Sequence, residues 1–548
     1  MRRGAPVCTL LLATVLWVVA GTHASSGANG RKPLLPEFQT SDRCIACHNG
    51  LLNSSGEDVS IGFDWRASMM GNSSRDPYWQ ASVRRESVDH AESKSAIEDE
   101  CSICHMPIPR YEAKVRGRQG EVFSHLPFAA DDKEGRQAAD GVSCSVCHQI
   151  SKDGLGTSQS FNGGFIVAPP DASDLRPEYG PFQIEAGHTR IMRSSSEGYR
   201  PTQSDHIRQS EMCATCHTLI TQALGPDGTV VGHLPEQMPY QEWLHSDFKD
   251  KRSCQSCHMP VINEDVPITR VFGMPRPGVS RHVFVAANFF MQRMLNRYRE
   301  FLGVTALPQE LTSAADRTMQ YLGSQAAHIA VEHVQVVSDR LVADVRVDNL
   351  GGHKLPTGYP SRRAWLHVVV RDRNGGRVFE SGALNADGSI QGNDNDTDPT
   401  KFESHYLEIR SGDEVQIYES ILGGPDGAPT TGLLTAVGYL KDNRLLPHGF
   451  DKRTAEPDIA VIGAAVNDAN FSDVGDVVRY SVPVNGEGPF ELEAELLYQP
   501  LSYRWATNLK MYGRYAEPKR FNEYYDSMSA ATAVVLARGA VTVTRPSP

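Results

Sequence analysis

The stretch Cys44-Ile45-Ala46-Cys47-His48 carries a pattern, Cys-x-x-Cys-His, that this chain repeats four more times. The other copies are Cys101-Ser102-Ile103-Cys104-His105, Cys144-Ser145-Val146-Cys147-His148, Cys213-Ala214-Thr215-Cys216-His217 and Cys254-Gln255-Ser256-Cys257-His258. They use ten of the eleven cysteines. This pentapeptide attaches c-type haem, because its two thiols become thioethers and its histidine binds the iron. The sequence therefore predicts five covalently attached haems, with the histidine of each copy as the proximal ligand.

Zinc and disulfides are the other common uses of paired cysteines. Structural zinc sites draw four ligands from two knuckles, whereas here the number of pairs is odd and a histidine follows each one directly. Disulfides are chemically open to an exported chain. They give no reason, however, for a histidine after every second cysteine, so haem attachment is the favoured interpretation.

The first residues predict export, which covalent haem attachment also requires. Arg2-Arg3 precedes the apolar run Val7–Ala20, and Thr22-His23-Ala24 resembles a cleavage site. We therefore expect residues 1–24 to be a signal peptide. The run is too short to span a bilayer, and no other stretch approaches that length. The mature chain is thus expected to lack a transmembrane segment and to be periplasmic, extracellular or associated with the outer membrane.

Composition narrows the class of partner. The net charge is −12 and charged residues make up 22% of the chain, with no basic stripe. Nucleic acid is therefore not expected as a partner. The length is enough for two or three domains.

The haem motifs all lie in the first half of the chain. We expect residues 25–280 to form a mainly α-helical and irregular pentahaem domain, because this sequence is rich in Gly, Pro, Ser and Asp and would wrap the cofactors. Residues 281–327 are expected to close it as a helical segment. The predicted helices are Trp79–Glu100, Ala286–Leu302, with Phe290, Met294, Tyr298, Phe301 and Leu302 on its apolar face, and, after Pro308, Leu311–Ala327.

From about Ile329 onward the sequence pattern changes, and apolar residues alternate with polar ones. Leu341, Ala343, Val345 and Val347 show the period of a half-buried strand, as do Leu492, Ala494 and Leu496. Residues 328–548 are therefore predicted to form a β-sandwich-like domain. Further predicted strands are Trp365–Val370, Val415–Ile421, Val477–Val484 and Ala533–Val543, with turns at Asn374-Gly375, Asp387-Gly388, Asp426-Gly427 and Asn485-Gly486.

Three stretches outside the motifs are also distinctive. They are Trp65-Arg66-Ala67-Ser68-Met69-Met70, His282-Val283-Phe284-Val285-Ala286-Ala287-Asn288 and Gly352-His353-Lys354-Leu355-Pro356-Thr357-Gly358. Through them the chain resembles multihaem c-type cytochromes of the c-552 and c-554 kind, related to the tetrahaem type of the hydroxylamine-oxidation pathway, with an added C-terminal β-domain. The resemblance covers most of the chain.

This resemblance implies distal iron ligands at three positions. His282 matches the histidine of the family's His-x-Phe-x-Gly-Gly-Asn segment, although both glycines are alanine here. His353 matches the turn whose histidine reaches back to a haem, which would dock the β-domain on the haem domain. Met70 stands where relatives often have a ligand histidine, so its thioether either binds iron or packs against a porphyrin. Met69 is the weaker alternative to Met70.

Other histidines compete for the remaining distal positions. His125 and His206 are favoured because they lie upstream of the third and fourth motifs. The further candidates are His90, His188, His233 and His245, whereas His328, His333, His367, His405 and His448 are expected to be structural. The oxygen-rich stretch 393–398 is a weak candidate for Ca²⁺, with an exposed acidic loop as the alternative.

These features favour an electron-transfer protein over an enzyme. A row of mostly bis-His haems would pass electrons between a membrane quinol dehydrogenase or periplasmic donors and other cytochromes. The alternative is an oxidoreductase acting on a small nitrogen or sulfur compound at one five-coordinate haem. Pentahaem nitrite reductases resemble this chain in haem number, but they use Cys-x-x-Cys-Lys at the catalytic haem, and that motif is absent here. A third hypothesis is a structural subunit whose β-domain mediates assembly.

Overall fold

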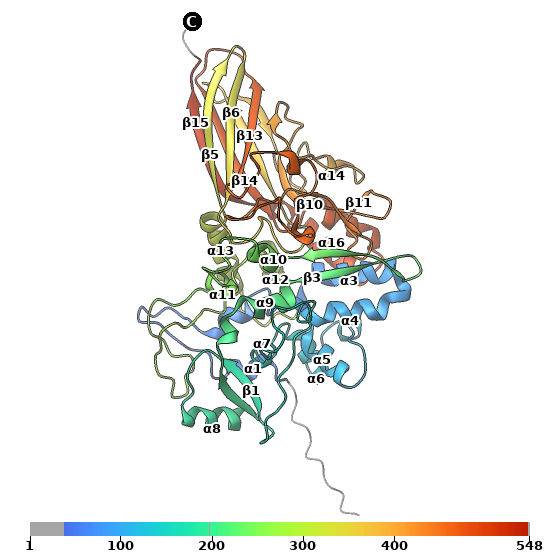
Figure 1. Cartoon of the computed structure of the whole chain (residues 1–548), viewed down its shortest axis with the longest axis vertical. Coiled ribbons are helices and arrows are strands. Elements are labelled where there is room, and N and C mark those ends of the chain that lie inside the picture. The colour runs from blue at the N-terminus through green and yellow to red at the C-terminus, as the bar shows by residue number, and fades with distance from the viewer. Residues whose placement is uncertain (1–37, 197, 546–548) are drawn as a thin grey trace, which may run out of the picture. The chain divides into compact units, whose positions relative to one another are not determined.

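The structure is a computed structural model that describes residues 38–196 and 198–545 (Figure 1). The predicted signal peptide lies outside these residues. The segment from Glu37 to Pro548 forms one compact unit, and the helices and strands named below belong to this unit. Among the described residues, no helix is both long and apolar enough to cross a bilayer.

All five pentapeptides lie on short helices or at their ends. These are α1 (Ser41–Ile45), α4 (Lys94–His105), α7 (Cys144–Gln149), α9 (Ser210–His217) and α11 (Cys254–His258). Residues three apart on a helix lie on the same side. Local helicity therefore turns both thiols of each motif toward one partner, and the histidine follows within the same turn.

Further short elements connect the motif helices. The helices are α2 (Ile61–Arg66), α3 (Pro77–Asp89), α5 (Pro107–Val115), α6 (Lys133–Ala139), α8 (Ala186–Ser195) and α10 (Pro239–Leu244). Strands β1 (Arg176–Gly180) and β2 (Tyr199–Gln203) pair in parallel, whereas β3 (Leu219–Leu224) and β4 (Val230–Gln237) form an antiparallel hairpin.

The single helix predicted over 79–100 is wrong, because the chain forms two helices there. The Asp76 side chain accepts hydrogen bonds from Tyr78 N and Trp79 N, and Pro77 occupies the first turn, which fixes the start of α3. At His90 the backbone leaves the helical region, with φ −123° and ψ 58°. After one turn of 3₁₀ helix, α4 runs on into the second motif.

Two longer helices follow the last motif. They are α12 (Phe289–Arg297) and α13 (Pro308–Gln325), so Pro308 begins the second helix, as proline can at a first turn. Phe290, Met294 and Leu302 are buried as predicted, but Phe301 is 83% exposed. Because α12 ends at Arg297, Phe301 and Leu302 both lie beyond the helix, and only Leu302 packs inward.

The remaining chain is mostly β-sheet, beginning with β5 directly after α13. One sheet has the strand order β11-β10-β7-β14-β15, with β12 and β8 added to its members, and another has the order β5-β6-β13-β9. The strands are β5 (Ala327–Val337), β6 (Arg340–Asn349), β7 (Arg363–Arg371), β8 (Arg377–Ser381), β9 (Glu408–Ile409), β10 (Ile417–Gly423), β11 (Pro429–Thr430), β12 (Gly438–Asp442), β13 (Asp476–Pro483), β14 (Phe490–Gln499) and β15 (Val534–Val543). Three helices lie between them: α14 (Asp394–Thr397), α15 (Tyr503–Asn508) and α16 (Ala516–Asp526).

The predicted alternation in this region is confirmed. In β6 the residues Leu341, Ala343, Val345 and Val347 are fully buried, and in β14 the apolar positions are buried while the intervening glutamates face outward. These side chains share one apolar core with α12, α13 and α16. The Asn374-Gly375 turn is also present, and Gly375 has φ +78°, a conformation that glycine adopts without strain.

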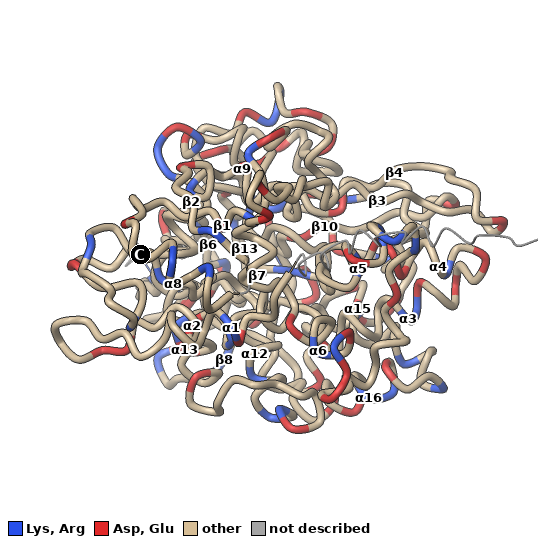
Figure 2. The backbone as a smooth tube through the Cα atoms, turned by 90° about the horizontal axis from the view of Figure 1, so that it is seen from below, with Lys and Arg blue, Asp and Glu red and all other residues tan. Residues whose placement is uncertain are grey.

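Charged residues are scattered along the described chain. Figure 2 shows Lys and Arg interspersed with Asp and Glu over many elements. The acidic net charge therefore does not come from one segment alone.

Candidate haem-binding site

The cysteines and histidines of all five motifs, which haem attachment requires, line one large cavity. All ten motif cysteines and all five motif histidines line it. Its volume is about 1250 Å³, which exceeds the roughly 300–1,000 Å³ of a site for one small molecule. The cysteines are free thiols among the described residues. The cavity therefore has the sulfur supply and the space that several large apolar groups need.

Four of the motif histidines are held in the tautomer that a metal requires. Each places its Nδ1 against a backbone carbonyl oxygen: His48 to Ile268 (2.6 Å), His105 to Ser73 (2.9 Å), His148 to Tyr179 (2.5 Å) and His258 to Val285 (2.6 Å). Donation from Nδ1–H leaves the Nε2 lone pair available. Burial lowers the pKa of His105 and His258 to about 4, so these rings are neutral at ordinary pH.

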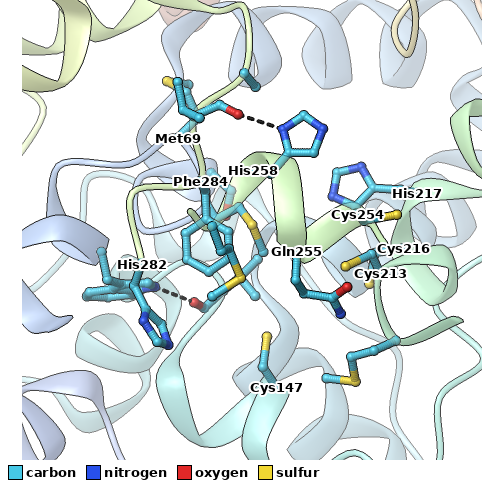
Figure 3. A pocket seen from close by; sticks show the side chains of 18 of the residues that line it. Met69, Cys147, Cys213, Cys216, His217, Cys254, Gln255, His258, His282 and Phe284 are labelled. Carbon is cyan, nitrogen blue, oxygen red and sulfur yellow. Dashed lines mark hydrogen bonds between the residues drawn. The ribbon is translucent and has the colours of Figure 1, made fainter. Parts of the chain in front are cut away.

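Two further histidines, His282 and His353, face motif histidines across the cavity. The ring centroids of His148 and His282 are 6.4 Å apart at an interplanar angle of 18°, and Figure 3 labels His282 in the cavity wall. Those of His258 and His353 are 6.2 Å apart at 13°. A nitrogen–metal bond of about 2 Å on each side of one ion separates two imidazole centroids by about 6 Å. Both pairs therefore have the spacing for one metal ion between them.

Contacts between cysteines show which motifs are neighbours. The Cys44 thiol lies within hydrogen-bond reach of Cys144, and the Cys216 thiol within reach of Cys104. The Cys213 thiol likewise reaches Cys254, as Figure 3 shows. Motif one thus adjoins motif three, and motif four adjoins both motif two and motif five. The pKa values of Cys213 and Cys216 are also raised in part by electrostatic interaction with Cys147, which places motif three near motif four.

Three other predicted ligands reach the cavity wall. Met69, Met70 and His188 all line it. Both nitrogens of His188 already have partners, since Nε2 lies 3.1 Å from Phe272 O and Nδ1 lies 3.4 Å from a Glu185 oxygen. Met69 also packs against the main apolar core.

Five predicted candidates do not line the cavity. They are His90, His125, His206, His233 and His245. His206 is buried, and both its nitrogens are engaged, with Ser204 Oγ at 2.7 Å and Ile150 O at 2.8 Å. His245 lies 3.2 Å from Asp451 O and packs on Phe450. The rings of His206 and His245 are thus engaged within the protein, and iron binding by the five candidates stays a prediction.

A buried ionic network holds the turn that carries His353. Glu242 accepts hydrogen bonds from Lys354 N (3.1 Å) and Thr357 Oγ1 (2.5 Å). Lys354 Nζ lies 2.8 Å from an Asp442 oxygen. Arg444 then joins Asp442 (2.7 Å) to Glu242 (3.0 Å). Motif matching could not find Glu242 or Asp442, because they are distant in sequence and carry no pattern of their own.

We expect Asp442→Asn to destabilise the protein by about 3–5 kcal/mol, because it leaves Lys354 buried without its carboxylate. Burial raises the pKa of Asp442, but Arg444 and Lys354 outweigh it and lower that pKa to about 2. A depressed carboxyl pKa stabilises the fold above the unfolded value near 4 and stops doing so as the pH falls toward 2. Urea unfolding between pH 2 and 7 measures both effects. The exposed Asp451→Asn should change stability by less than about 0.5 kcal/mol, and an equal loss in both variants would contradict the network's role.

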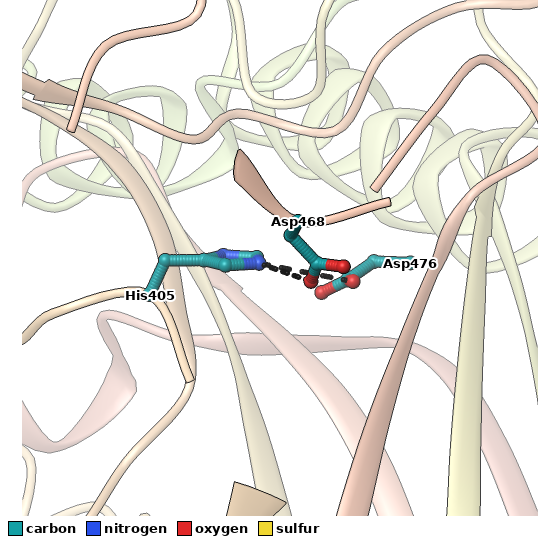
Figure 4. A group of neighbouring side chains, drawn as sticks. All are labelled: His405, Asp468 and Asp476. Atoms are coloured by element: carbon teal, nitrogen blue, oxygen red, sulfur yellow. Dashed lines mark hydrogen bonds and ion pairs between the residues drawn. The ribbon is translucent and has the colours of Figure 1, made fainter. Parts of the chain in front are cut away.

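A buried group of His405, Asp468 and Asp476 resembles a metal site (Figure 4). Its hydrogen bonds indicate otherwise. His405 Nδ1 faces amide N–H donors from Gln416 (2.9 Å) and Asn443 (3.1 Å), whose oxygens each accept a backbone N–H. Nδ1 therefore carries no proton, and Nε2–H donates to Asp468 at 3.0 Å. A metal-bound imidazole needs the opposite arrangement, so His405 has a structural role.

Several side-chain oxygens of the stretch 393–398 are engaged within the protein. Both carboxylate oxygens of Asp396 bind Arg363, each at 2.9 Å. Asn393 Oδ1 accepts from Asn395 N, and Asp398 Oδ1 accepts from Thr400 N. Calcium binding by this stretch stays a prediction.

Comparison with known proteins adds evidence on the fold. No family model matches this sequence, and no curated protein is detectably similar to it. Among solved structures, the chain is similar to a penta-heme cytochrome c552 from Thermochromatium tepidum, with a TM-score of 0.52 at 16% identity. The match covers 92% of this chain and 99% of that one. The chain has a pentahaem cytochrome-like fold. At this identity the likeness concerns the fold alone, and the cytochrome-like fold accounts for cysteines and histidines gathered around one cavity.

Proposed function

We propose that this protein is an exported pentahaem c-type cytochrome that transfers electrons through its haems. The observation that carries the proposal is the gathering of all five motifs around one cavity, in an unbroken series of neighbours. Haem c bound there supplies one-electron redox chemistry at each iron. The chain's own part is to hold the thiols, orient the imidazoles and exclude water.

The order of motifs in space differs from their order in sequence. Motifs one, three and four form a series, and motifs two and five both adjoin motif four. Electrons entering at motif one would therefore reach a branch at motif four. With both motif two and motif five beside motif four, electrons could leave by either of two haems. Such an arrangement suits a protein that connects more than two redox sites.

The facing rings assign two axial pairs. His282 would bind opposite His148, and His353 opposite His258, as their spacing supports. Of the other predicted ligands, Met69 and Met70 also line the cavity, whereas both nitrogens of His188 are already engaged. His353 belongs to the β-rich region, so its bond to iron would dock a sandwich-like domain, residues 328–548, on the haem domain, residues 25–280.

The cellular location that we propose follows from covalent haem attachment, which takes place outside the cytoplasm. We infer export to the periplasm or cell surface, and partners that are themselves redox proteins, such as other cytochromes or a membrane quinol dehydrogenase. Electron-transfer contacts between proteins are usually small and transient. The mildly acidic chain would favour a partner with a basic docking face.

Mass spectrometry combined with low-temperature EPR of the exported protein tests this proposal. Five added haems and reduction of all of them by one donor are expected. Fewer than five haems would contradict the assignment of the motifs. Electron transfer between the haems that is slower than electron exchange with an external partner would contradict the proposal that the haems form a conduit.

One observation favours a second candidate function, an oxidoreductase acting on a small nitrogen or sulfur compound. In the described chain, no imidazole faces His48, His105 or His217 at the axial spacing seen for the other two pairs, and the ring that stacks on His105 is Trp79. Beside Cys101 the cavity wall instead carries Glu86 and Glu236, and burial raises the pKa of Glu236 to about 7. A high-spin EPR signal that changes on addition of hydroxylamine would support this candidate, and five low-spin signals would eliminate it.

A further inference from the structure

Two consecutive arginines at the start of β7 have opposite environments. Arg363 is buried and binds Asp396 with two hydrogen bonds of 2.9 Å. Arg362 lies on the other side of the strand start and lines the cavity. Its guanidinium donates to Thr357 O at 2.7 Å. Among residues 38–196 and 198–545, no carboxylate lies within ion-pair distance of Arg362.

A buried hydroxyl without a partner lies near this arginine. Tyr498 of β14 is 1% exposed and lines the same cavity. Its OH has no hydrogen-bond partner among the described residues. Burial raises the pKa of Tyr498 to about 12, and the nearby positive charge of Arg362 opposes that rise. The Arg362 guanidinium and the Gln237 side chain both lie beside Gly358, and Gln237 pairs with Leu219, two residues after His217. Tyr498 pairs with Ala364, two residues after Arg362, so Arg362 lies near both Tyr498 and the fourth motif.

Both groups lack the partner that their chemistry calls for. A buried hydroxyl without a hydrogen bond costs about 1–3 kcal/mol. Arg362 is half-buried, and it has no carboxylate of the kind that Lys354, Arg444 and Arg363 have, since Lys354 and Arg444 bind Asp442 and Arg363 binds Asp396. A planar guanidinium with free N–H groups matches the two oxygens of a carboxylate or a similar oxyanion.

We propose that Arg362 and Tyr498 together bind one anionic oxygen group at the His217 end of the cavity. The chemistry is that of a carboxylate or a small oxyanion. Its two sources are a haem propionate and a free anion such as nitrite or sulfite. The proposal rests on haem attachment at the fourth motif, which mass spectrometry checks independently of the variants below.

The test compares Arg362→Gln and Tyr498→Phe with the wild-type haem-loaded protein. Nitrite and sulfite are titrated at constant ionic strength while visible spectra are recorded, and the haem potentials are measured by redox titration. Tyr480→Phe is the matched control, because Tyr480 is equally buried with an unpartnered hydroxyl but does not line the cavity. Haem content and circular dichroism establish that each variant is folded.

Two results support the proposal and name the source. If the anion is free, the wild type shows saturable spectral changes, and each variant weakens the apparent affinity at least about tenfold. If the anion is a propionate, added anions have no effect, but Arg362→Gln lowers one midpoint potential, since loss of a positive charge favours the oxidised iron. A tenfold change in that redox equilibrium corresponds to about 59 mV.

Other results overturn it. The proposal fails if Arg362→Gln changes neither the titrations nor any of the five potentials. It also fails if Tyr480→Phe has the same effect as Tyr498→Phe, because the response would then come from general loosening. Arg362→Lys keeps the charge without the planar fork, and it should restore the potential more fully than the affinity for a free anion.

Discussion

Chain produced without haem attachment is expected to remain unfolded over its first half. The structure contains a cavity of about 1250 Å³ that would be empty without cofactors. A cavity left by a single large-to-small substitution already costs about 2.7–5 kcal/mol, and whole domains are stable by only about 5–15 kcal/mol. We therefore expect the haems to supply much of the packing in the first half of the chain.

Expression with and without the residues 1–24 in a host that attaches haem c only outside the cytoplasm gives the comparison. Limited proteolysis should cut the cytoplasmic product throughout residues 38–290 and release a resistant fragment from the β-rich region, which contributes most of the main apolar core. Circular dichroism and the haem absorbance report on the same samples. A cytoplasmic product as resistant as the exported one would show that side chains alone fill the space.

Replacement of His353 by Ala is expected to convert one of five haems from low spin to high spin and to loosen the β-rich region. His353 faces His258 at the spacing of an axial pair, and it extends from the segment between β6 and β7. Loss of a metal bond belongs to the largest class of mutational effects, above about 4 kcal/mol. EPR counts the converted haem, and the rate of proteolysis within residues 328–548 measures the loosening.

His282→Ala is the matched comparison. It should convert one haem in the same way, because His282 faces His148. It should leave the β-rich region as resistant as the wild type, since His282 precedes that region in the chain. The exposed His328→Ala should change neither signal. Identical proteolysis of the His353→Ala and His282→Ala variants would remove His353 as the docking ligand, and unchanged spectra would make it a structural residue.

Local sequence was sufficient wherever the information is local. The haem motifs needed no tertiary knowledge, because thiols three residues apart on one helical turn face the same way whatever surrounds them. The alternation in β6 and β14 was equally readable, since period two places successive side chains on opposite faces. The prediction of a single helix over 79–100 was wrong because the backbone leaves the helical region at His90. The spacing of apolar residues gives no sign of that break.

What only the tertiary structure decided is which distant groups meet. His206, a histidine favoured from sequence, is tied to Ser204 and Ile150, whereas His188 reaches the cavity with both nitrogens already engaged. Arg362 and Arg363 are chemically identical neighbours, yet one has a carboxylate and the other faces the cavity. An iron ligand is defined by where its lone pair points, and that direction depends on packing between segments hundreds of residues apart. The sequence alone therefore predicts five haem sites and the residues that anchor them, and the packing decides which motifs are neighbours and which histidines face them.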